Sequence, residues 1–288
     1  MRGDVSYLFG LLLAAVCAAG LFSSPQKAKP SRDTTELAAI LEKCAAYCEK
    51  LDNCVLYYVC QERLHEEVFE PVPTRVHTYY SQESQFFQVR PNMTAKNDYV
   101  YDYQLVRKAG RLDESRTLIR ENGQARQEKN ARLKTSVYLF KNIVFGPIGL
   151  LGKAWQPKHD YKILREEKVR GRQAVVIRAT PKPGEWTGNL YGTVWIGKDD
   201  FSTLRIEWVQ DSIQNFSRIQ KSAAESGLKL NVVLTGEFGY EKNGIRFPSN
   251  FSILEELLNL RGMRNTSYRL IVDYGNYKFF TVETDVKY

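Results

Sequence analysis

The sequence has few of the residues on which most enzymatic sites depend. Three histidines occur in 288 residues, and His65, His77 and His159 each stand alone. The zinc-protease pattern H-E-x-x-H is not completed at His65, because Phe69 stands where the second histidine is required. The patterns G-x-S-x-G and C-x-x-C-H are also absent. We therefore expect a protein that is not an enzyme and that has no cofactor and no metal site.

Carboxylate pairs are frequent, but they are not arranged as a catalytic acid and base. Adjacent residues of a strand point to opposite faces of the sheet, so neighbouring acids do not face each other across a substrate. We interpret these pairs as solvated surface. They are Glu66/Glu67, Asp199/Asp200 and Glu255/Glu256.

Long apolar runs are absent beyond the N-terminus. Val5 to Ala19 are almost continuously apolar, and small and then polar residues follow. This run is too short for a membrane span and is typical of a cleaved signal peptide. We predict a signal peptide over 1–22, a polar linker over 23–32 and export to the periplasm. Acylation of Cys17 and a retained signal segment remain as alternatives that would anchor the protein to the membrane.

The charge pattern excludes one class of partner. Lysine and arginine number 41 against 33 acids, for a net charge of +8. The basic residues are interleaved with acids rather than gathered into a compact run, so we expect no nucleic acid partner. The net charge is compatible with an anionic membrane surface or acidic envelope proteins, but a well-solvated surface is the favoured interpretation.

Four cysteines fall within one short segment, at Cys44, Cys48, Cys54 and Cys60. In an oxidising compartment they are disulfide candidates, with three full pairings open. A zinc site is the less favoured alternative, because the spacing lacks the usual C-x2-C pair.

The rest of the chain is organised as hairpins. Asp33 and Glu36 form a capping-box pattern before a helix with apolar residues at helical spacing up to Leu51. Strand and turn signals then alternate to the C-terminus. We predict a mainly β (α+β) fold over 33–288 as a single domain. A curved antiparallel sheet would form a half-barrel, with the N-terminal helix and one or two further helices on its concave face.

Three local predictions are specific enough to be tested by the structure. The charged stretch 121–134 is expected to form a loop or a short helix. A hairpin is expected between 230–240 and 245–254, around Asn243-Gly244. A final hairpin is expected between 268–274 and 277–286.

The stretch 137–155 is the most apolar part of the chain after the signal segment, and glycines interrupt it. Two interpretations stand: a plug that fills the open side of the sheet, and a mobile lid over a lipid-sized cavity. The candidate lining residues of an apolar cavity are Phe140, Ile143, Val144, Phe145, Ile148, Leu150, Leu151 and Trp155, with Trp195 nearby.

The hairpin around 189–207 carries a pattern W-I-x-x-x-D-x-x-x-L-R-I-E, which runs from Trp195 to Glu207 and includes Asp200. This pattern resembles the bacterial outer-membrane lipoprotein-sorting, or lipoprotein-carrier, superfamily. The chain is also similar to uncharacterised secreted bacterial proteins that share the phrases NLYG-x-x-W-I and NGI-x-FPS. The resemblance implies a periplasmic half-barrel that binds or carries lipid, lipoprotein acyl chains or a lipidated protein. An envelope interaction or sensor module with a filled core is the alternative.

Overall fold

The computed structural model describes residues 32–54, 57–69, 93–108, 111–185, 190–213, 216–259 and 262–280. The predicted signal peptide, most of the predicted linker and Cys17 lie outside these residues, and so does the side chain of Cys54. The domain boundaries therefore stay predictions.

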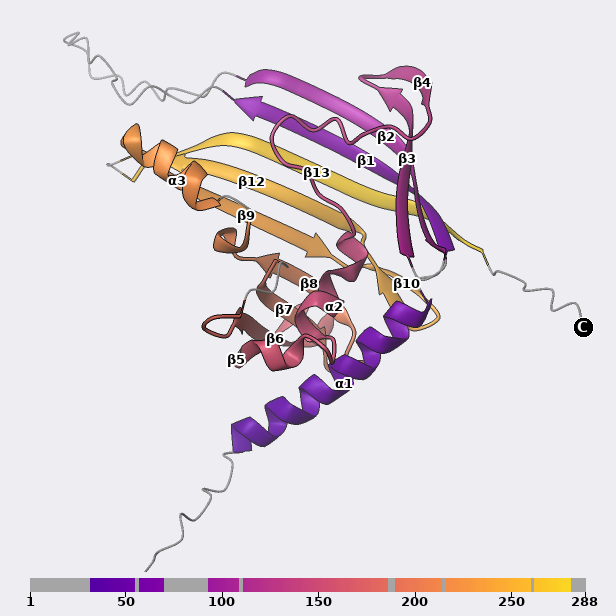
Figure 1. Ribbon diagram of the computed structural model, residues 1–288, viewed down its shortest axis with the longest axis vertical. Helices are drawn as coiled ribbons and strands as arrows, with labels where there is room; N and C mark the ends of the chain where they lie inside the picture. The colour runs from indigo at the N-terminus through magenta and orange to yellow at the C-terminus, as the bar shows by residue number, and fades with distance from the viewer. Residues whose placement is uncertain are drawn as a thin grey trace, which may run out of the picture.

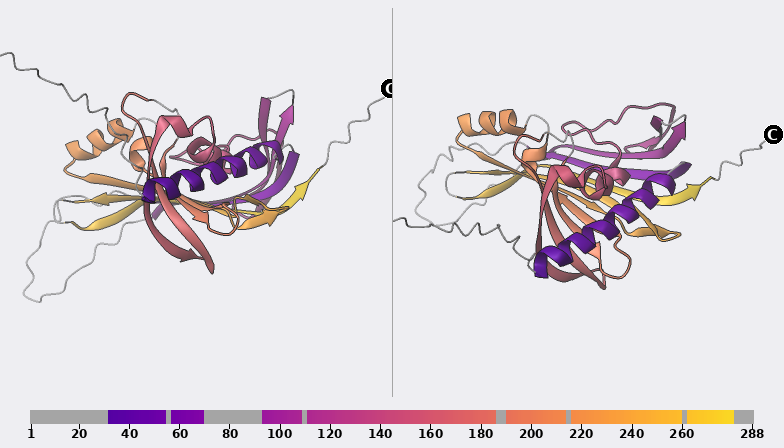
Figure 2. Two further views of the ribbon diagram at one scale, coloured as in Figure 1. Left: turned by 90° about the horizontal axis from the view of Figure 1, so that it is seen from below. Right: turned by 60° about the horizontal axis from the view of Figure 1, so that its bottom comes forward.

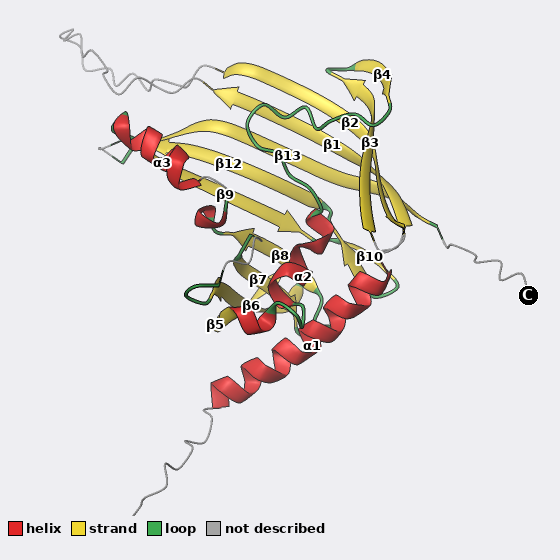
Figure 3. Ribbon diagram, in the orientation of Figure 1, coloured by secondary structure: helices red, strands yellow, loops and turns green. Residues whose placement is uncertain are grey.

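One antiparallel sheet contains 11 strands and forms the frame of the molecule (Figures 1 and 3). Its edges are β4 and β5, so the sheet is not closed. In sheet order the strands are β4 (Gln124–Glu128), β3 (Arg111–Glu121), β2 (Met93–Lys108), β1 (Tyr57–Phe69), β13 (Arg264–Phe279), β12 (Asn250–Leu258), β9 (Lys229–Glu237), β8 (Thr203–Trp208), β7 (Gly192–Gly197), β6 (Arg172–Pro181) and β5 (His159–Val169).

The sheet consists of two meanders that meet at β13. Strands β1 to β4 follow each other across one half, and β5 to β9 with β12 cross the other half. The last strand, β13, pairs with β12 on one side and β1 on the other. The first and last strands of the described residues, β1 and β13, thus lie side by side in the middle of the sheet.

Helices lie on the concave side of this curved sheet, as Figure 2 shows. Helix α1 (Arg32–Cys54) contacts α2 (Gly146–Leu151), which lies against β8. Short 3-10 turns η1 (Ile143–Phe145) and η2 (Gln156–Lys158) flank α2, and η3 (Gln210–Ser212) precedes α3 (Phe216–Glu225), which packs on β9. A separate small hairpin joins β10 (Tyr240–Lys242) to β11 (Ile245–Phe247). The predicted fold class, a curved antiparallel sheet with an N-terminal helix and further helices, is confirmed.

Strand alternation divides the apolar residues between two faces. The two larger core clusters include residues of α1 and alternate residues of the strands, and therefore lie on the concave side. A small third cluster holds Ala174, Val176, Trp195 and Leu204. Trp195 alternates with Val194 and Ile196, which belong to the main cluster, so it lies on the opposite, convex face.

Two local predictions are wrong in informative ways. Residues 124–128 form a strand rather than a loop or helix, because Asn122 and Gly123 adopt positive φ values of 48° and 82° and turn the chain tightly. Residues 268–279 belong to one strand rather than a hairpin. Gly275 pairs with Gln61 and Lys278 pairs with Val59, so extra residues are accommodated as a bulge.

The predicted hairpin between 230–240 and 245–254 is confirmed, and its turn at Asn243-Gly244 directly joins the short strands β10 and β11. The longer partners are β9 and β12, which pair with each other beyond this small hairpin. Residues 238–239 and 248–249 separate the two pairings, and Pro248 has no N–H to donate to a ladder.

The described cysteines are free thiols. Cys44, Cys48 and Cys60 are buried, and the expected bridges between them are not formed in this structure. Burial raises the pKa of the Cys44 thiol to about 12. At neutral pH such a thiol stays protonated and behaves as a small apolar side chain.

Candidate binding face and its cover

A continuous segment, residues 131–158, fills the concave face between α1 and the sheet without adding a strand to it. We call residues 131–142 the strap, residues 143–158 the plug, and both together the cover. Figure 3 shows the strap as a loop between β4 and α2. The face beneath the cover is the candidate binding face.

The plug sits close to the sheet because of a glycine. A Cβ atom at Gly146 would lie 2.9 Å from Cζ2 of Trp208 and 3.2 Å from Cδ1 of Ile206. Leu150 and Leu151 of the same helix are 0% and 1% exposed. The glycines that interrupt this apolar stretch therefore permit close packing, and the plug is part of the core.

The plug is also tied to α1 and β5. The side-chain amide of Gln156 donates hydrogen bonds to the carbonyl oxygens of Leu41 and Leu151, each at 2.7 Å. The hydroxyl of Tyr161 donates to the carbonyl oxygen of Leu150 at 2.6 Å. Cys48 Sγ lies 3.5 Å from the carbonyl oxygen of Pro147. These contacts fix the plug through a few side chains rather than through a strand ladder.

The strap is held by side chains that rise from the sheet. The backbone N–H of Lys134 donates to the hydroxyl of Tyr101 at 3.2 Å, and that of Asn142 donates to Glu114 Oε1 at 3.1 Å. The hydroxyl of Tyr138 donates to Glu255 Oε2. A segment that crosses over a sheet is out of reach of the strand ladder, so its polar groups need such acceptors.

Glu66 is the central acceptor for the strap. It is 0% exposed, and its Oε1 accepts hydrogen bonds from the N–H of Ser136 at 2.6 Å and from the hydroxyl of Tyr268 at 2.9 Å. Its Oε2 accepts from Ser136 Oγ and from the amide of Asn97, both at 3.0 Å. The expectation that Glu66 is a solvated surface acid is wrong, because these donors replace water around the carboxylate.

A second buried acid on β1 has a different partner. Glu62 is 0% exposed and receives both Nε and Nη2 of Arg116, at 2.6 and 3.1 Å. Arg116 Nη2 also lies 3.4 Å from Glu114 Oε1, and its guanidinium lies over the Tyr103 ring at 5.0 Å. Burial raises the pKa of Glu62, and the guanidinium of Arg116 opposes this rise.

Tyrosines surround this pair in what we call the tyrosine cluster, Tyr58, Tyr103, Tyr274 and Tyr277. Burial raises the pKa of each well above its ordinary value. At neutral pH these phenols remain protonated, so they supply neither a base nor a nucleophile. The cluster of perturbed pKa values therefore gives no support to an enzymatic reading.

The structure brings together most of the predicted lining residues. Ile143, Val144, Leu150 and Leu151 are buried, whereas Phe140, Phe145, Ile148 and Trp155 are partly buried. They lie in the cover itself and pack toward the concave core, apart from Trp155, which is not part of the core clusters. Trp195 is not among them. On the convex face its ring lies beneath the guanidinium of Arg205 at 4.8 Å, and its indole N–H donates to Glu167.

The residues of the binding face that the sequence reasoning missed are Glu62, Glu66, Arg116, Tyr138 and Trp208. One signal was present. Glu62 and Glu66 alternate with Tyr58, Cys60 and Leu64 along β1, so the apolar face of that strand carries acids. The seat of Trp208 against Gly146 depends on residues far apart in sequence and had no local signal.

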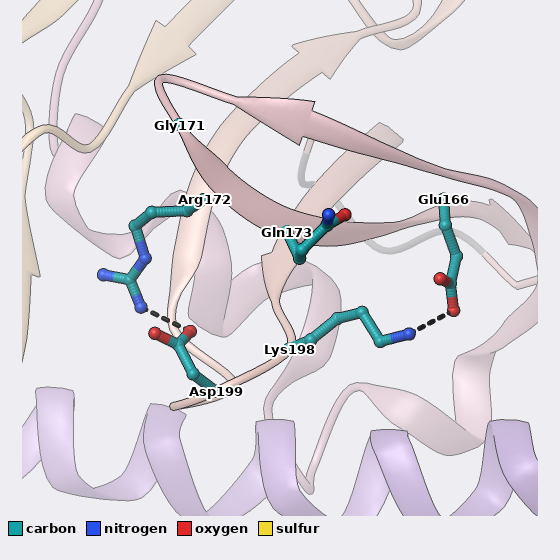
Figure 4. A pocket seen from close by; sticks show the side chains of 6 residues that line it. All are labelled: Glu166, Gly171, Arg172, Gln173, Lys198 and Asp199. Atoms are coloured by element: carbon teal, nitrogen blue, oxygen red, sulfur yellow. Dashed lines mark hydrogen bonds and ion pairs between the residues drawn. The ribbon is translucent and has the colours of Figure 1, made fainter.

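Two surface hollows are not lined by the predicted cavity residues, although the second borders the strap at Ala131. One, of about 750 Å³, is lined by Glu166, Gly171, Arg172, Gln173, Lys198 and Asp199 (Figure 4). Arg172 pairs with Asp199 at 2.5 Å and Lys198 with Glu166 at 2.6 Å. Each charge in it is compensated by a neighbour, so the hollow has no charge excess that would select an ion. The other, of about 380 Å³, lies beside Arg116 and Glu114.

Asp200, the acid of the hairpin pattern, has a structural role. Its Oδ1 accepts from the N–H and Oγ of Ser202, at 3.0 and 2.6 Å, and its Oδ2 lies 2.8 Å from Arg172. Arg246, which is 8% exposed, donates to Ser202 Oγ at 2.8 Å. The pattern thus encodes a cross-linked turn rather than a reactive group.

Within the described residues, no group of histidine, cysteine, aspartate or glutamate side chains is arranged to hold a metal ion. In that same part of the chain, no helix has the length and apolar character that crossing a membrane requires.

Comparisons with known proteins give similarity at the level of structure. No family model matches the chain, and no curated protein matches it. Among solved structures, a DUF1329 family protein from Desulfovibrio piger is 13% identical, covers 86% of this chain and 95% of its own, and has a TM-score of 0.37.

Two further structures are similar. A putative outer membrane lipoprotein-sorting protein domain from Vibrio parahaemolyticus is 11% identical, with 86% and 93% of the two chains covered and a TM-score of 0.37. A LolA superfamily protein from Nitrosomonas europaea is 14% identical, with 85% and 94% covered and a TM-score of 0.34. The second of these three structures carries the lipoprotein-sorting name of the superfamily that the hairpin pattern resembles. Their identities and TM-scores are low, so we derive no function from them.

Proposed function

We propose that this protein is an exported, non-enzymatic binding or carrier protein whose concave sheet face takes an apolar ligand when the cover moves aside. The ligand would be a lipid, an acyl chain or a lipidated protein in the cell envelope. One observation carries the proposal: the cover fills the concave face without joining the strand ladder. Its two ends make backbone hydrogen bonds, from Ala131 N–H to the carbonyl oxygen of Arg116 and from Lys182 N–H to the carbonyl oxygen of Lys158, both at 2.9 Å. Between these ends the bonds that hold it to α1 and to the sheet involve side chains. Such a segment is released at lower cost than a strand of the sheet.

The apolar surface beneath the cover supports a greasy ligand. The Tyr138 ring lies 5.3 Å from that of Tyr268, and the Phe140 ring lies 5.0 Å from that of Phe251. On the same face, the ring centroids of Trp208 and Phe251 lie 6.0 Å apart. Displacing the cover would leave these rings exposed, and exposed apolar surface of this kind binds apolar partners.

A second function is supported by the filled state of the face. Leu150, Leu151 and Val144 are at most 1% exposed, so a permanently packed cover would leave the protein as an interaction module in the envelope, using its outer surface. The two functions differ in whether the cover opens.

The test is binding of a fluorescent fatty-acid probe, together with native mass spectrometry after gentle purification and organic extraction. Replacing Tyr138 by Phe removes the hydroxyl that is bonded to Glu255 and weakens the cover. Replacing Tyr57 by Phe removes a hydroxyl that accepts from Gln104 at 2.9 Å on the other face. We expect probe binding to strengthen in Tyr138→Phe and to be unchanged in Tyr57→Phe. If neither the wild type nor Tyr138→Phe binds the probe or yields extractable lipid, the interaction module becomes the better account.

A further inference from the structure

The strap has the shape of an extended chain laid across the sheet. Along it the side chains alternate: Val137 and Leu139 are 51% and 78% exposed, whereas Tyr138 between them is 8% exposed. Phe140 follows on the inner side, against Phe251. This two-residue period is that of a β-strand, although the strap makes no strand ladder. The face beneath it is therefore shaped to receive alternate side chains of an extended polypeptide.

The same face carries acceptors aimed at a main chain. Glu66, Glu114 and Tyr101 bind backbone N–H groups of the strap, at residues 136, 142 and 134. The carboxylate of Glu66 also accepts hydrogen bonds from Tyr268 and Asn97, which belong to the sheet and fix its position. The acceptors are thus fixed before any ligand arrives, and they recognise N–H groups whatever the side chains.

An acyl chain alone does not satisfy the part of the face beneath the strap. It has no donor, so it would leave the fully buried Glu66 without the bonds that Ser136 now supplies. A buried acceptor without its donors is unfavourable, and a carboxylate is more so than a neutral group. A polypeptide supplies the N–H groups and also offers apolar side chains to the aromatic rings.

The charges of the strap and of the face beneath it narrow the class of ligand further. The concave face under the strap carries Glu62, Glu66, Glu114 and Glu255 beside the guanidinium of Arg116. The strap itself, ARLKTSVYLFKN, contains three basic residues and no acid. Of these, Lys134 pairs with Glu121 at 3.5 Å and with Glu128 at 3.1 Å. A segment that replaces the strap with a basic residue at this position gains the same ion pairs.

We propose that the strap occupies the place of a partner protein's extended segment, basic in charge, with aromatic or aliphatic side chains at alternate positions. This proposal rests on the proposed function, because the cover must open for either ligand. It names the ligand that the strap half of the face takes.

The test uses a fluorescent synthetic peptide with the sequence of residues 131–145, added to the exported chain and to its Tyr138→Phe and Tyr57→Phe variants. We expect the peptide to bind the Tyr138→Phe variant, and to bind it more tightly than Tyr57→Phe, because the resident strap competes less. A peptide of the same composition in scrambled order is expected not to bind.

Two modified peptides make the test independent of the protein's folding. N-methylation at Ser136 deletes the N–H that meets Glu66, whereas N-methylation at Leu139 lies at a residue whose side chain points outward. We expect the first to weaken binding by about tenfold or more, as for loss of a hydrogen bond to a charged group. Equal binding of the two methylated peptides would overturn the proposal.

The outcomes separate this proposal from the function on which it rests. If the fatty-acid probe binds the Tyr138→Phe variant but the peptide does not, the binding function stands and the polypeptide ligand is wrong. If neither the fatty-acid probe nor the peptide binds, the proposed function and the polypeptide ligand are both wrong. Dimers that form by exchange of straps and dissociate on addition of the peptide would assign the face to a second copy of this chain, and that also overturns the proposal.

Discussion

Three glutamates of β1 offer one substitution in three environments. Glu62 faces a guanidinium, and Glu66 faces neutral donors. Glu67 lies on the other face of the strand and pairs at 3.0 Å with Arg269, whose side chain is 44% exposed. Replacing each by Gln removes one charge and keeps the volume. The three variants therefore measure what the carboxylate charge contributes in each place.

The expected costs in the free energy of unfolding differ by environment. Glu62→Gln leaves the buried guanidinium of Arg116 with only Glu114 at 3.4 Å, and loss of one partner of a buried pair costs about 3–5 kcal/mol. We expect the low end, because Glu114 remains. Glu66→Gln keeps one carbonyl acceptor for the Ser136 N–H and loses charge-assisted bonds, for about 1–3 kcal/mol. Glu67→Gln should cost less than about 1 kcal/mol, as for surface pairs.

Urea unfolding followed by tryptophan fluorescence measures all three, with Trp208 as a reporter beside the plug. The double variant Glu62→Gln/Arg116→Met removes both charges and is expected to cost less than Glu62→Gln alone, because it leaves no unpaired cation. The reasoning is refuted if Glu62→Gln costs no more than Glu67→Gln, or if the double variant is the least stable of the set.

Three further predictions concern packing, pH and the cross-linked turn. Gly146→Ala places a methyl group against Trp208 and should cost about 1–3 kcal/mol of stability, whereas Gly275→Ala enters open space and should cost little; equal effects in urea unfolding would contradict the close seat of the plug. In the folded protein the tyrosine cluster keeps its phenolic protons, whereas in the unfolded chain tyrosine loses its proton above the ordinary pKa of 10.0. The free energy of unfolding therefore falls as pH rises beyond that value. Absorbance at 295 nm should show these tyrosines ionising only when circular dichroism reports unfolding; earlier ionisation of every tyrosine would count against it. Asp200→Ala should lower stability by about 1–3 kcal/mol and Asp199→Ala by less than about 1 kcal/mol, measured as thermal midpoints, and the reverse order would exclude the structural role of Asp200.

The fold was predictable where the signal was local. Every second residue from 99 to 105 is tyrosine or leucine, a period typical of a strand with one buried face, and Tyr99, Tyr101, Tyr103 and Leu105 are all buried. The capping pattern at Asp33 predicted the helix that became α1. Strand β4 has a local signal as well, because Asn122-Gly123 is a tight-turn pair, but its residues QARQE are exposed at every position and show no apolar alternation.

Other features depend on contacts that no local pattern records. At Gly275-Asn276 the sequence looks like a hairpin turn, and only the partner strand β1 decides that it is a bulge within β13. Trp195 and Ile196 are neighbours, yet the pleat sends them to opposite faces, and the choice of face depends on where α1 and the plug pack. The burial of Glu66 has no local signal, because one of its hydrogen-bond donors, Ser136, lies 70 positions away in the strap.

The place of β13 has a consequence for how the chain acquires its structure. Tyr58 pairs with Phe279 and Val68 pairs with Tyr268, so β1 receives one of its two neighbours only when the chain is present as far as residue 279. Until then the two meanders have no common strand. Contacts of such long sequence separation are associated with slow folding, since a large loop must close before they form. A growing chain of this protein would thus stay open in its middle until its last strand arrives, and shortening the C-terminus into β13 would divide the sheet rather than trim its edge.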